Sequence, residues 1–197
     1  VTGGIILIVG IFLFLIVFSK FFVFENGYNK TILTITFAAF ITFFIGIYDD
    51  ILYISSKKKI LVITIINILI FQNIEFFQIR ILIFDNSFFN FRLSVMSISL
   101  ILSIICFLAF HYSLTIIDGI NGVFGTYNVI YLIIILFYFE LEKEIQNFIY
   151  FLILLNFFVT YLNLKGLLFY GNSGSLTMSS ILAYFTLYIY NIRENDI

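Results

Sequence analysis

The chain has 197 residues, of which 62% are hydrophobic and 11% charged, with a formal net charge of -1 at pH 7. An ordinary soluble domain carries about 25% charged residues, so this composition excludes that class and predicts a polytopic membrane protein. No basic run exceeds Lys57 to Lys59, so nothing indicates nucleic acid as a partner. The single cysteine, Cys106, lies in an apolar run and excludes an intrachain disulfide.

The apolar runs, taken in chain order, predict seven membrane-spanning helices, because about 20 apolar residues cross a bilayer and about 17 suffice. The expected spans are residues 4–24, 31–48, 60–77, 93–111, 123–140, 147–163 and 176–190. We therefore expect an all-α transmembrane bundle of about seven spans, as a single integral-membrane domain over residues 1–197. The chain starts at Val1 with no signal-peptide pattern, so we expect a fragment that lacks both ends of a longer protein.

Three polar clusters interrupt the apolar runs: Gly46 to Asp50 (GIYDD), Asp118 to Gly122 (DGING) and Gly171 to Ser175 (GNSGS). An unpaired charge at the centre of a membrane helix costs roughly 2.5 to 3.5 kcal/mol, so such clusters indicate function. If the spans alternate across the bilayer, the three clusters emerge on one face and can meet. The connectors on the other face, residues 25–30, 78–92 and 140–147, are expected to be ordinary solvated loops.

The clusters contain residues suited to phosphate chemistry. Asp49 and Asp50 stand at a helix end, with Lys57 to Lys59 about two turns further on. Magnesium binds carboxylates together with substrate phosphates, and a lysine holds diphosphate as a point charge. A charged helix end that anchors the membrane interface explains the same residues. The dense Lys57 to Lys59 run favours a cytoplasmic location for this face.

The other two clusters have a functional and a purely structural interpretation. In DGING, the glycines permit close ligand approach while Asp118 and Asn121 offer oxygens to a metal or a base, but an ordinary turn has the same composition. In GNSGS, backbone N–H groups at the start of a helix suit a phosphate, whereas Ser or Asn capping of the last helix is the plain alternative.

Single polar residues near the clusters are less specific. His111, at the expected end of the fourth span, is a candidate base or ligand, although an interfacial histidine commonly has neither role. Asn67, Asn73 and Asn163 lie in or beside apolar spans, where interhelical hydrogen bonding is the expected role.

The order and spacing of the clusters resemble those of the polyprenyl-phosphate N-acetylhexosamine-1-phosphate transferases, the glycosyltransferase family 4 that includes phospho-N-acetylmuramoyl-pentapeptide transferase. Gly3-Gly4 looks like the end of the family's PTPxxGG motif, and Gly46 to Asp50 like its GxxDD motif. Asp118 to Gly125 resembles DGxDGxxG, and Phe169 to Ser175 resembles FxGDxGS. The match extends over most of the chain, and the WecA-like branch looks closer than the peptidoglycan branch.

The resemblance implies a Mg²⁺-dependent transfer of N-acetylhexosamine phosphate from a UDP-sugar to a polyprenyl phosphate such as undecaprenyl phosphate. This reaction releases UMP and initiates a cell-envelope glycan such as lipopolysaccharide. The enzyme would lie in the inner (plasma) membrane with its active-site loops in the cytoplasm. A homodimer is compatible with it, and no nucleic acid is expected.

The resemblance also implies roles for particular residues. The expected catalytic residues are Asp49, Asp50 and Asp118, with Asp118 and Asn172 as magnesium ligands. Phe169 matches the aromatic residue that stacks on uracil. The further substrate-binding residues are Asn121, Lys57, Ser173 and Gly174.

Two departures from the family pattern keep other functions open. Asn172 and Asn121 replace family aspartates, and an amide oxygen ligates magnesium without a carboxylate's charge. A degenerate relative that binds nucleotide-sugar or lipid without turnover is therefore one alternative. A transporter is another, but its acids should lie in mid-span within Gly/Pro-broken repeats, whereas this chain has no proline and its acids cluster at span ends.

Overall fold

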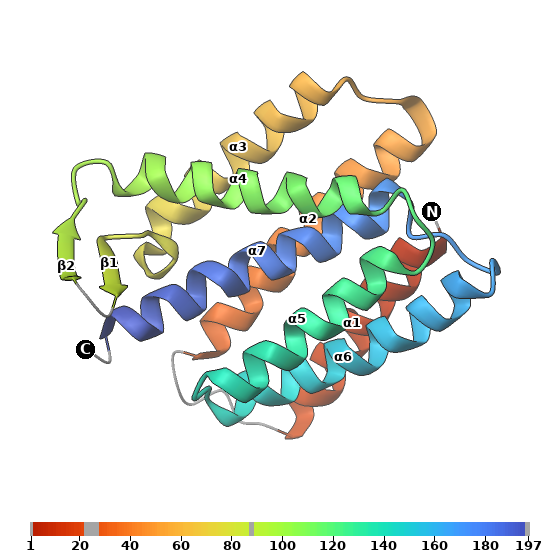
Figure 1. Ribbon diagram of the computed structural model, residues 1–197. Helices are drawn as coiled ribbons and strands as arrows, with labels where there is room; N and C mark the ends of the chain where they lie inside the picture. Colours follow the sequence, from red (N-terminus) through yellow and green to blue (C-terminus); the bar gives the residue numbers. More distant parts are fainter. Residues whose placement is uncertain (1, 22–27, 87–88, 196–197) are drawn as a thin grey trace.

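The computed structural model describes residues 2–21, 28–86 and 89–195, which form seven α-helices and one β-hairpin (Figure 1). The elements are α1 (Thr2–Phe21), α2 (Tyr28–Leu52), α3 (Ser56–Asn73), a 3-10 turn (Glu75–Phe77), β1 (Ile81–Asn86), β2 (Phe89–Ser94), α4 (Ser99–Ile117), α5 (Val123–Tyr138), α6 (Lys143–Leu164) and α7 (Gly171–Asn195). The described residues are mainly helical, and the hairpin is the one exception among them to the expected all-α fold.

Three helices in the described part of the chain are long and apolar enough to cross a membrane: Lys30–Leu52 of α2, Ser99–Ile117 of α4 and Lys143–Leu164 of α6. Two shorter apolar helices, Thr2–Val17 and Val123–Tyr138, accompany them. The expected number of about seven spans is therefore more than the structure shows. The remaining two helices are less uniformly apolar, since α3 begins with three lysines and the first half of α7 is rich in serine.

The largest difference from the expected elements is the hairpin. Residues 78–92 were expected to form a solvated connector and 93–111 a helix, but β1 pairs antiparallel with β2, with Ile81 opposite Ser94. The β2 sequence FNFRLS alternates apolar and polar residues, which is the period of a strand and not of a helix. As a result α4 begins only at Ser99 and continues to Ile117, so His111 lies inside the helix.

Helix ends also differ elsewhere. The span expected at 60–77 ends as a helix at Asn73, and the last expected helix begins at Gly171 instead of residue 176. The GNSGS cluster is therefore the first turn of α7 and not a loop. Residues 22–24 of the first expected span, and residues 25–27 of the connector after it, lie outside the described residues.

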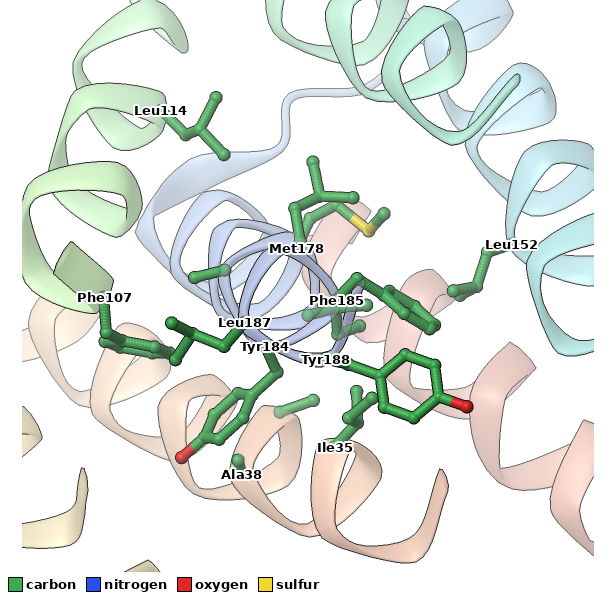
Figure 2. Close-up of a cluster of buried hydrophobic side chains, with 14 of the residues drawn as sticks. Ile35, Ala38, Phe107, Leu114, Leu152, Met178, Tyr184, Phe185, Leu187 and Tyr188 are labelled. Carbon is green, nitrogen blue, oxygen red and sulfur yellow. The ribbon is translucent and has the colours of Figure 1, made fainter. Parts of the chain in front are cut away.

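Helix α7 is the centre of the bundle. It contacts α1, α2, α4 and α5, and every residue from 173 to 185 is buried. Figure 2 shows α7 nearly end-on, with Phe107 of α4, Leu152 of α6 and Ile35 of α2 around it. Because protein surrounds this helix, its serine and threonine side chains do not have to face lipid.

Small residues bring the first turn of α7 close to two other helices. A Cβ on Gly46 of α2 would overlap the backbone of Ser173, and a Cβ on Gly4 of α1 would lie 2.5 Å from the Ser173 Oγ and 2.7 Å from the Gly174 nitrogen. Small residues at helix contacts permit such backbone approach in membrane proteins. The glycines of the first two motifs therefore place α1 and α2 directly against α7.

The chain path brings the three polar clusters to one end of the bundle. The α2–α3, α4–α5 and α6–α7 connections lie at the end where α1 begins, while the hairpin and the C-terminal end of α7 lie at the opposite end (Figure 1). The expected meeting of the clusters is confirmed by the contacts between them described below.

Candidate functional site

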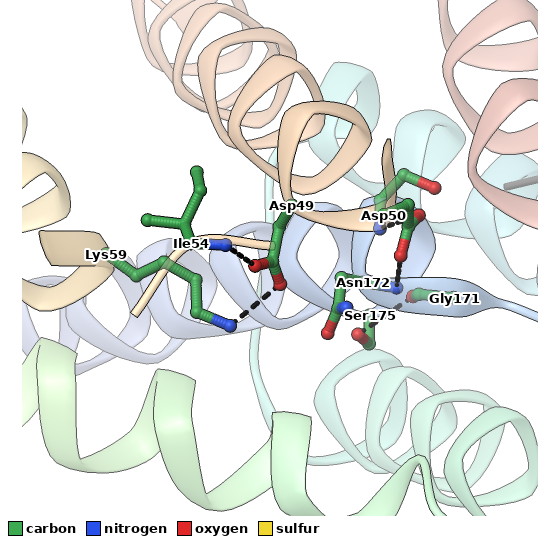
Figure 3. Close-up of polar contacts among 8 residues, drawn as sticks. Asp49, Asp50, Ile54, Lys59, Gly171, Asn172 and Ser175 are labelled. Carbon is green, nitrogen blue, oxygen red and sulfur yellow. Dashed lines mark hydrogen bonds and ion pairs between the residues drawn. The ribbon is translucent and has the colours of Figure 1, made fainter. Parts of the chain in front are cut away.

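The acidic pair lies in the last turn of α2, and its two carboxylates point to different neighbours (Figure 3). Asp49 is only 5% exposed; its Oδ1 accepts the Ile54 N–H at 2.7 Å, and its Oδ2 pairs with Lys59 Nζ at 2.8 Å. Lys59 lies in the first helical turns of α3, so Asp49 fixes the α2–α3 connection. The lysine that pairs with the acid is Lys59, whereas the expected substrate-binding residue Lys57 is exposed.

Asp50 binds the N-terminus of α7. Its Oδ1 accepts the Asn172 N–H at 2.9 Å and its Oδ2 accepts the Ser173 N–H at 3.1 Å. A carboxylate there satisfies N–H groups that have no partner within the helix and interacts favourably with the helix dipole. The third N–H, that of Gly174, donates to the Tyr170 carbonyl at 3.1 Å. Of the two interpretations of GNSGS, the structure therefore favours a capped helix start, with Asp50 as the capping group.

The side chains of GNSGS have different surroundings. Asn172 is exposed beside Asp50, so its amide is accessible at the end of the bundle. Ser173 is fully buried next to Gly4, which leaves no exposed hydroxyl for a substrate. Ser175 donates to the Gly171 carbonyl at 3.0 Å, a bond to the preceding helical turn and not a side-chain cap.

Asp118 follows the last residue of α4 and reaches α7. Burial raises the pKa of Asp118 to about 7; the nearby Ser175 side chain lowers this pKa, and the neighbouring Asp50 carboxylate raises it. Two carboxylates from different helices, Asp50 and Asp118, thus lie close enough at the start of α7 to influence each other. This pairing is typical of functional sites, although structural networks also produce it.

The DGING turn is anchored from α6. Gly122 has φ +79, a left-handed conformation that favours glycine, and its N–H donates to Asn163 Oδ1 at 2.5 Å. A Cβ on Gly122 would overlap the Leu164 side chain. Asn121, directly before it, is exposed. The turn is therefore held by its backbone and offers the Asn121 side chain to the outside.

Phe169, like Asn121, is an exposed side chain on an anchored backbone, here that of the α6–α7 connection. It is 57% exposed, whereas its neighbours Leu168 and Tyr170 are 5% and 1% exposed. The Phe169 carbonyl accepts the Gly3 N–H at 3.1 Å, and the Tyr170 hydroxyl lies 3.1 Å from Thr160 Oγ1. An aromatic ring held on an anchored backbone is available for stacking.

A cleft of about 680 Å³ opens between the end of α2 and the start of α3. Its walls are mostly apolar, and Lys58 and Lys59 supply positive charge. The lining residues are Phe44, Ile45, Tyr48, Leu52, Tyr53, Ile54, Ser55, Lys58, Lys59 and Val62. The cleft therefore combines apolar surface with cations beside Asp49.

Some residues that sequence reasoning considered lie elsewhere or act differently. His111 is fully buried in α4, stacked on Phe107 at 5.5 Å, and stands seven residues before Asp118, about 10 Å along the helix. Lys59, Ser175 and the backbone role of Asn163 were missed. A lysine run and an asparagine in an apolar span were visible signals, but the partner of each depends on the fold.

Within the described residues, no group of three or more His, Cys, Asp or Glu side chains could hold a metal ion. Magnesium does not need such a group, because it is usually bound through one or two carboxylates with substrate phosphates and waters. The oxygen-bearing side chains at the start of α7 are those of Asp50, Asp118 and Asn172; the Asn172 backbone N–H binds Asp50, and its side chain is exposed. These are oxygen donors of the kind that magnesium prefers, so the residues present fit the ion.

The fold and the site define a helical membrane protein with carboxylates gathered at one end of the bundle. Comparison with known families identifies its family. The family model of glycosyl transferase family 4 matches residues 32–190. The chain belongs to this family. Membership implies a membrane transferase that uses a nucleotide-sugar donor and a lipid-phosphate acceptor. No curated protein and no solved structure matches the chain.

Proposed function

We propose that the protein transfers N-acetylhexosamine 1-phosphate from a UDP-sugar to a polyprenyl phosphate such as undecaprenyl phosphate. The observation that carries the proposal is the gathering of Asp50, Asp118 and Asn172 at the start of α7, from three motifs that are far apart in the sequence. An oxygen of the lipid phosphate attacks the β-phosphorus of the donor, the bond from that phosphorus to UMP breaks, and a lipid diphosphate-sugar forms.

The chain's own residues bind and orient the two substrates in this proposal. Phe169 stacks on the uracil and Asn121 lines the nucleotide site, since both side chains are exposed on anchored loops. Asp118 and Asn172 would hold Mg²⁺, which would neutralise phosphate charge. Asp50 fixes Asn172 against α2 through the backbone of α7. Positioning and charge neutralisation dominate such reactions, because a phosphate nucleophile is already ionised near pH 7.

The acceptor approaches from the membrane beside α2 and α3. The apolar cleft there suits a polyprenyl chain, and Lys57 with its two neighbours supplies positive charge for the phosphate. Asp49 lies next to this cleft and is held by Lys59. The N–H groups of Ser173 and Gly174 are occupied, so these two residues contribute by close packing at the site.

The family branch, the membrane topology and the oligomeric state are part of the same proposal. The described helices belong to one integral-membrane domain of the WecA-like branch, and all seven cross the inner membrane. The loops of the site face the cytoplasm, where UDP-sugars are found. The product initiates a cell-envelope glycan. A homodimer stays a prediction that the mass of the detergent-solubilised particle tests.

The proposal is tested by UMP release from UDP-N-acetylglucosamine in membranes that contain the protein, with and without undecaprenyl phosphate and Mg²⁺. We expect release that needs both and is lost in Asp118→Asn. Glu140→Gln is the matched control, because Glu140 is an exposed acid in the α5–α6 connection, away from the clusters. Release without the lipid, or with Asp118→Asn as active as the control, would contradict the proposal.

A second candidate function is a relative that binds its ligands without turnover. The exposed amides of Asn172 and Asn121, in place of carboxylates, favour it because they add no charge for the metal. The Asn172→Asp variant decides between the two functions. A transferase should need roughly tenfold less Mg²⁺ in this variant, the equivalent of about 1.4 kcal/mol of metal affinity. UMP release absent in both forms, with UDP-sugar binding retained, would favour the second candidate.

A further inference from the structure

Asn163 of α6 connects two loops of the site, the α4–α5 turn and the α6–α7 connection. It lies near the end of α6 and is only 4% exposed, and both halves of its amide are used. Its Oδ1 accepts the Gly122 N–H at 2.5 Å, and its Nδ2 donates to the Leu168 carbonyl at 2.8 Å. One side chain therefore holds the α4–α5 turn and the α6–α7 connection at the same time.

The two bonded residues stand next to the exposed residues of the site. Gly122 directly follows Asn121, and Leu168 directly precedes Phe169. Neither Asn121 nor Phe169 is buried, so the position of each depends on the backbone that carries it. The connection extends further, because the Phe169 carbonyl accepts the Gly3 N–H at the start of α1.

The surroundings of Asn163 leave little freedom for another arrangement. Gly122 has a left-handed backbone, and the Leu164 side chain fills the space where a Cβ would stand. The Asn163 carbonyl also accepts the Gly166 N–H at 2.9 Å, which closes the turn after α6. A buried amide with both halves bonded is costly to disrupt, because each partner left without a hydrogen bond stays buried and unsatisfied.

We propose that Asn163 is a positioning residue that fixes Asn121 and Phe169 relative to each other and so sets the affinity for the nucleotide-sugar. It touches the two loops and not the substrate. The effect on nucleotide-sugar affinity rests on the proposed function. The coupling of the two loops by Asn163 does not. Affinity for the lipid acceptor, whose cleft lies between α2 and α3, does not depend on Asn163.

The test compares Asn163→Leu with Asn67→Leu. Asn67 is an equally buried asparagine whose amide donates to Ile63 and accepts from Tyr184, but it lies in α3, away from the two loops. For Asn163→Leu we expect a KM for UDP-N-acetylglucosamine raised roughly tenfold or more and a KM for undecaprenyl phosphate within about twofold of wild type, since tenfold corresponds to the loss of about 1.4 kcal/mol. Asn67→Leu should lower thermal stability without this split.

Hydrogen exchange of the backbone amides gives a readout that needs no activity. Segments 118–123 and 166–170 should both exchange faster in Asn163→Leu and not in Asn67→Leu. If Asn163→Leu does not fold, Asn163→Asp keeps the acceptor for Gly122 and removes the donor to Leu168, so only segment 166–170 should loosen.

The possible outcomes separate the two proposals. Unchanged exchange in both segments, or donor and acceptor KM values that rise together, would overturn the role of Asn163. Absence of UMP release in the wild type would end the proposed function alone, because the exchange result still decides whether Asn163 couples the loops.

Discussion

At the scale of single residues, Asp118 is the group whose protonation matters most near neutral pH. Its pKa of about 7 lies well above the usual value near 3.9 for an aspartate, because the side chain is partly buried and lies near Asp50. At pH 6 only about a tenth of this carboxyl is ionised. Binding of a divalent cation, which needs the ionised form, should therefore strengthen as the pH rises through 7.

The raised pKa also predicts how stability depends on pH. The folded state binds the Asp118 proton more tightly than the unfolded state, so this contribution to stability is complete below about pH 4 and is lost as the pH rises to about 7. We expect Asp118→Asn to match the wild type near pH 4 and to be more stable than it near pH 8. Thermal unfolding in detergent at both pH values measures this, and a pH-independent difference would contradict it.

At the scale of elements, the junction of α1, α2 and α7 holds the site together. Two carboxylates from one turn of α2 reach α3 and α7, respectively, and two glycines allow the backbones to approach. This arrangement gives the GxxDD pattern a structural meaning, because its glycine packs on the helix start that its second aspartate binds. The acid pair is thus a connector as well as a candidate catalytic group.

The glycine at this junction can be tested directly. In Gly46→Ala the new Cβ would overlap the Ser173 backbone, which cannot move aside like a flexible side chain. Overpacking of this kind typically costs about 1 to 3 kcal/mol, so the midpoint of thermal unfolding should fall by several degrees. Gly119→Ala is the control, since its Cβ would meet nothing nearer than the Ile116 oxygen at 3.9 Å. Equal midpoints for the two variants would show that the junction is not tightly packed.

At the scale of the whole molecule, the bundle has two chemically different ends. One carries the three clusters, and the other carries the hairpin and the C-terminal end of α7 (Figure 1). The proposed function places the first end in the cytoplasm, because UDP-sugars are found there.

Cysteine labelling tests this orientation in a Cys106→Ser background. Lys57→Cys and Glu140→Cys place a thiol at exposed positions at opposite ends. An impermeant maleimide should label Glu140→Cys from outside intact cells and Lys57→Cys only in inverted vesicles. Labelling of both from one side would contradict the orientation.

The sequence by itself determined the class of protein, the approximate positions of the seven α-helices of the described residues and the gathering of the three clusters at one end. These follow from composition and from the lengths of apolar runs, which are local properties. The motifs also indicated Asp49, Asp50, Asp118 and Asn172 as candidate site residues. The hairpin was missed because residues 78–92 were interpreted as a solvated connector, although residues 89–94 alternate apolar and polar side chains.

Only the tertiary structure decided which partners these residues have. Asp50 and the α7 backbone are 122 positions apart, and Asn163 and Gly122 are 41 apart, so no local pattern links them. The choice of Lys59 over Lys57 as the partner of Asp49 depends on the direction in which α3 leaves the α2–α3 connection. Hydrogen bonds and ion pairs act over a few ångströms in space, and the packing of α7 between its neighbours sets those distances.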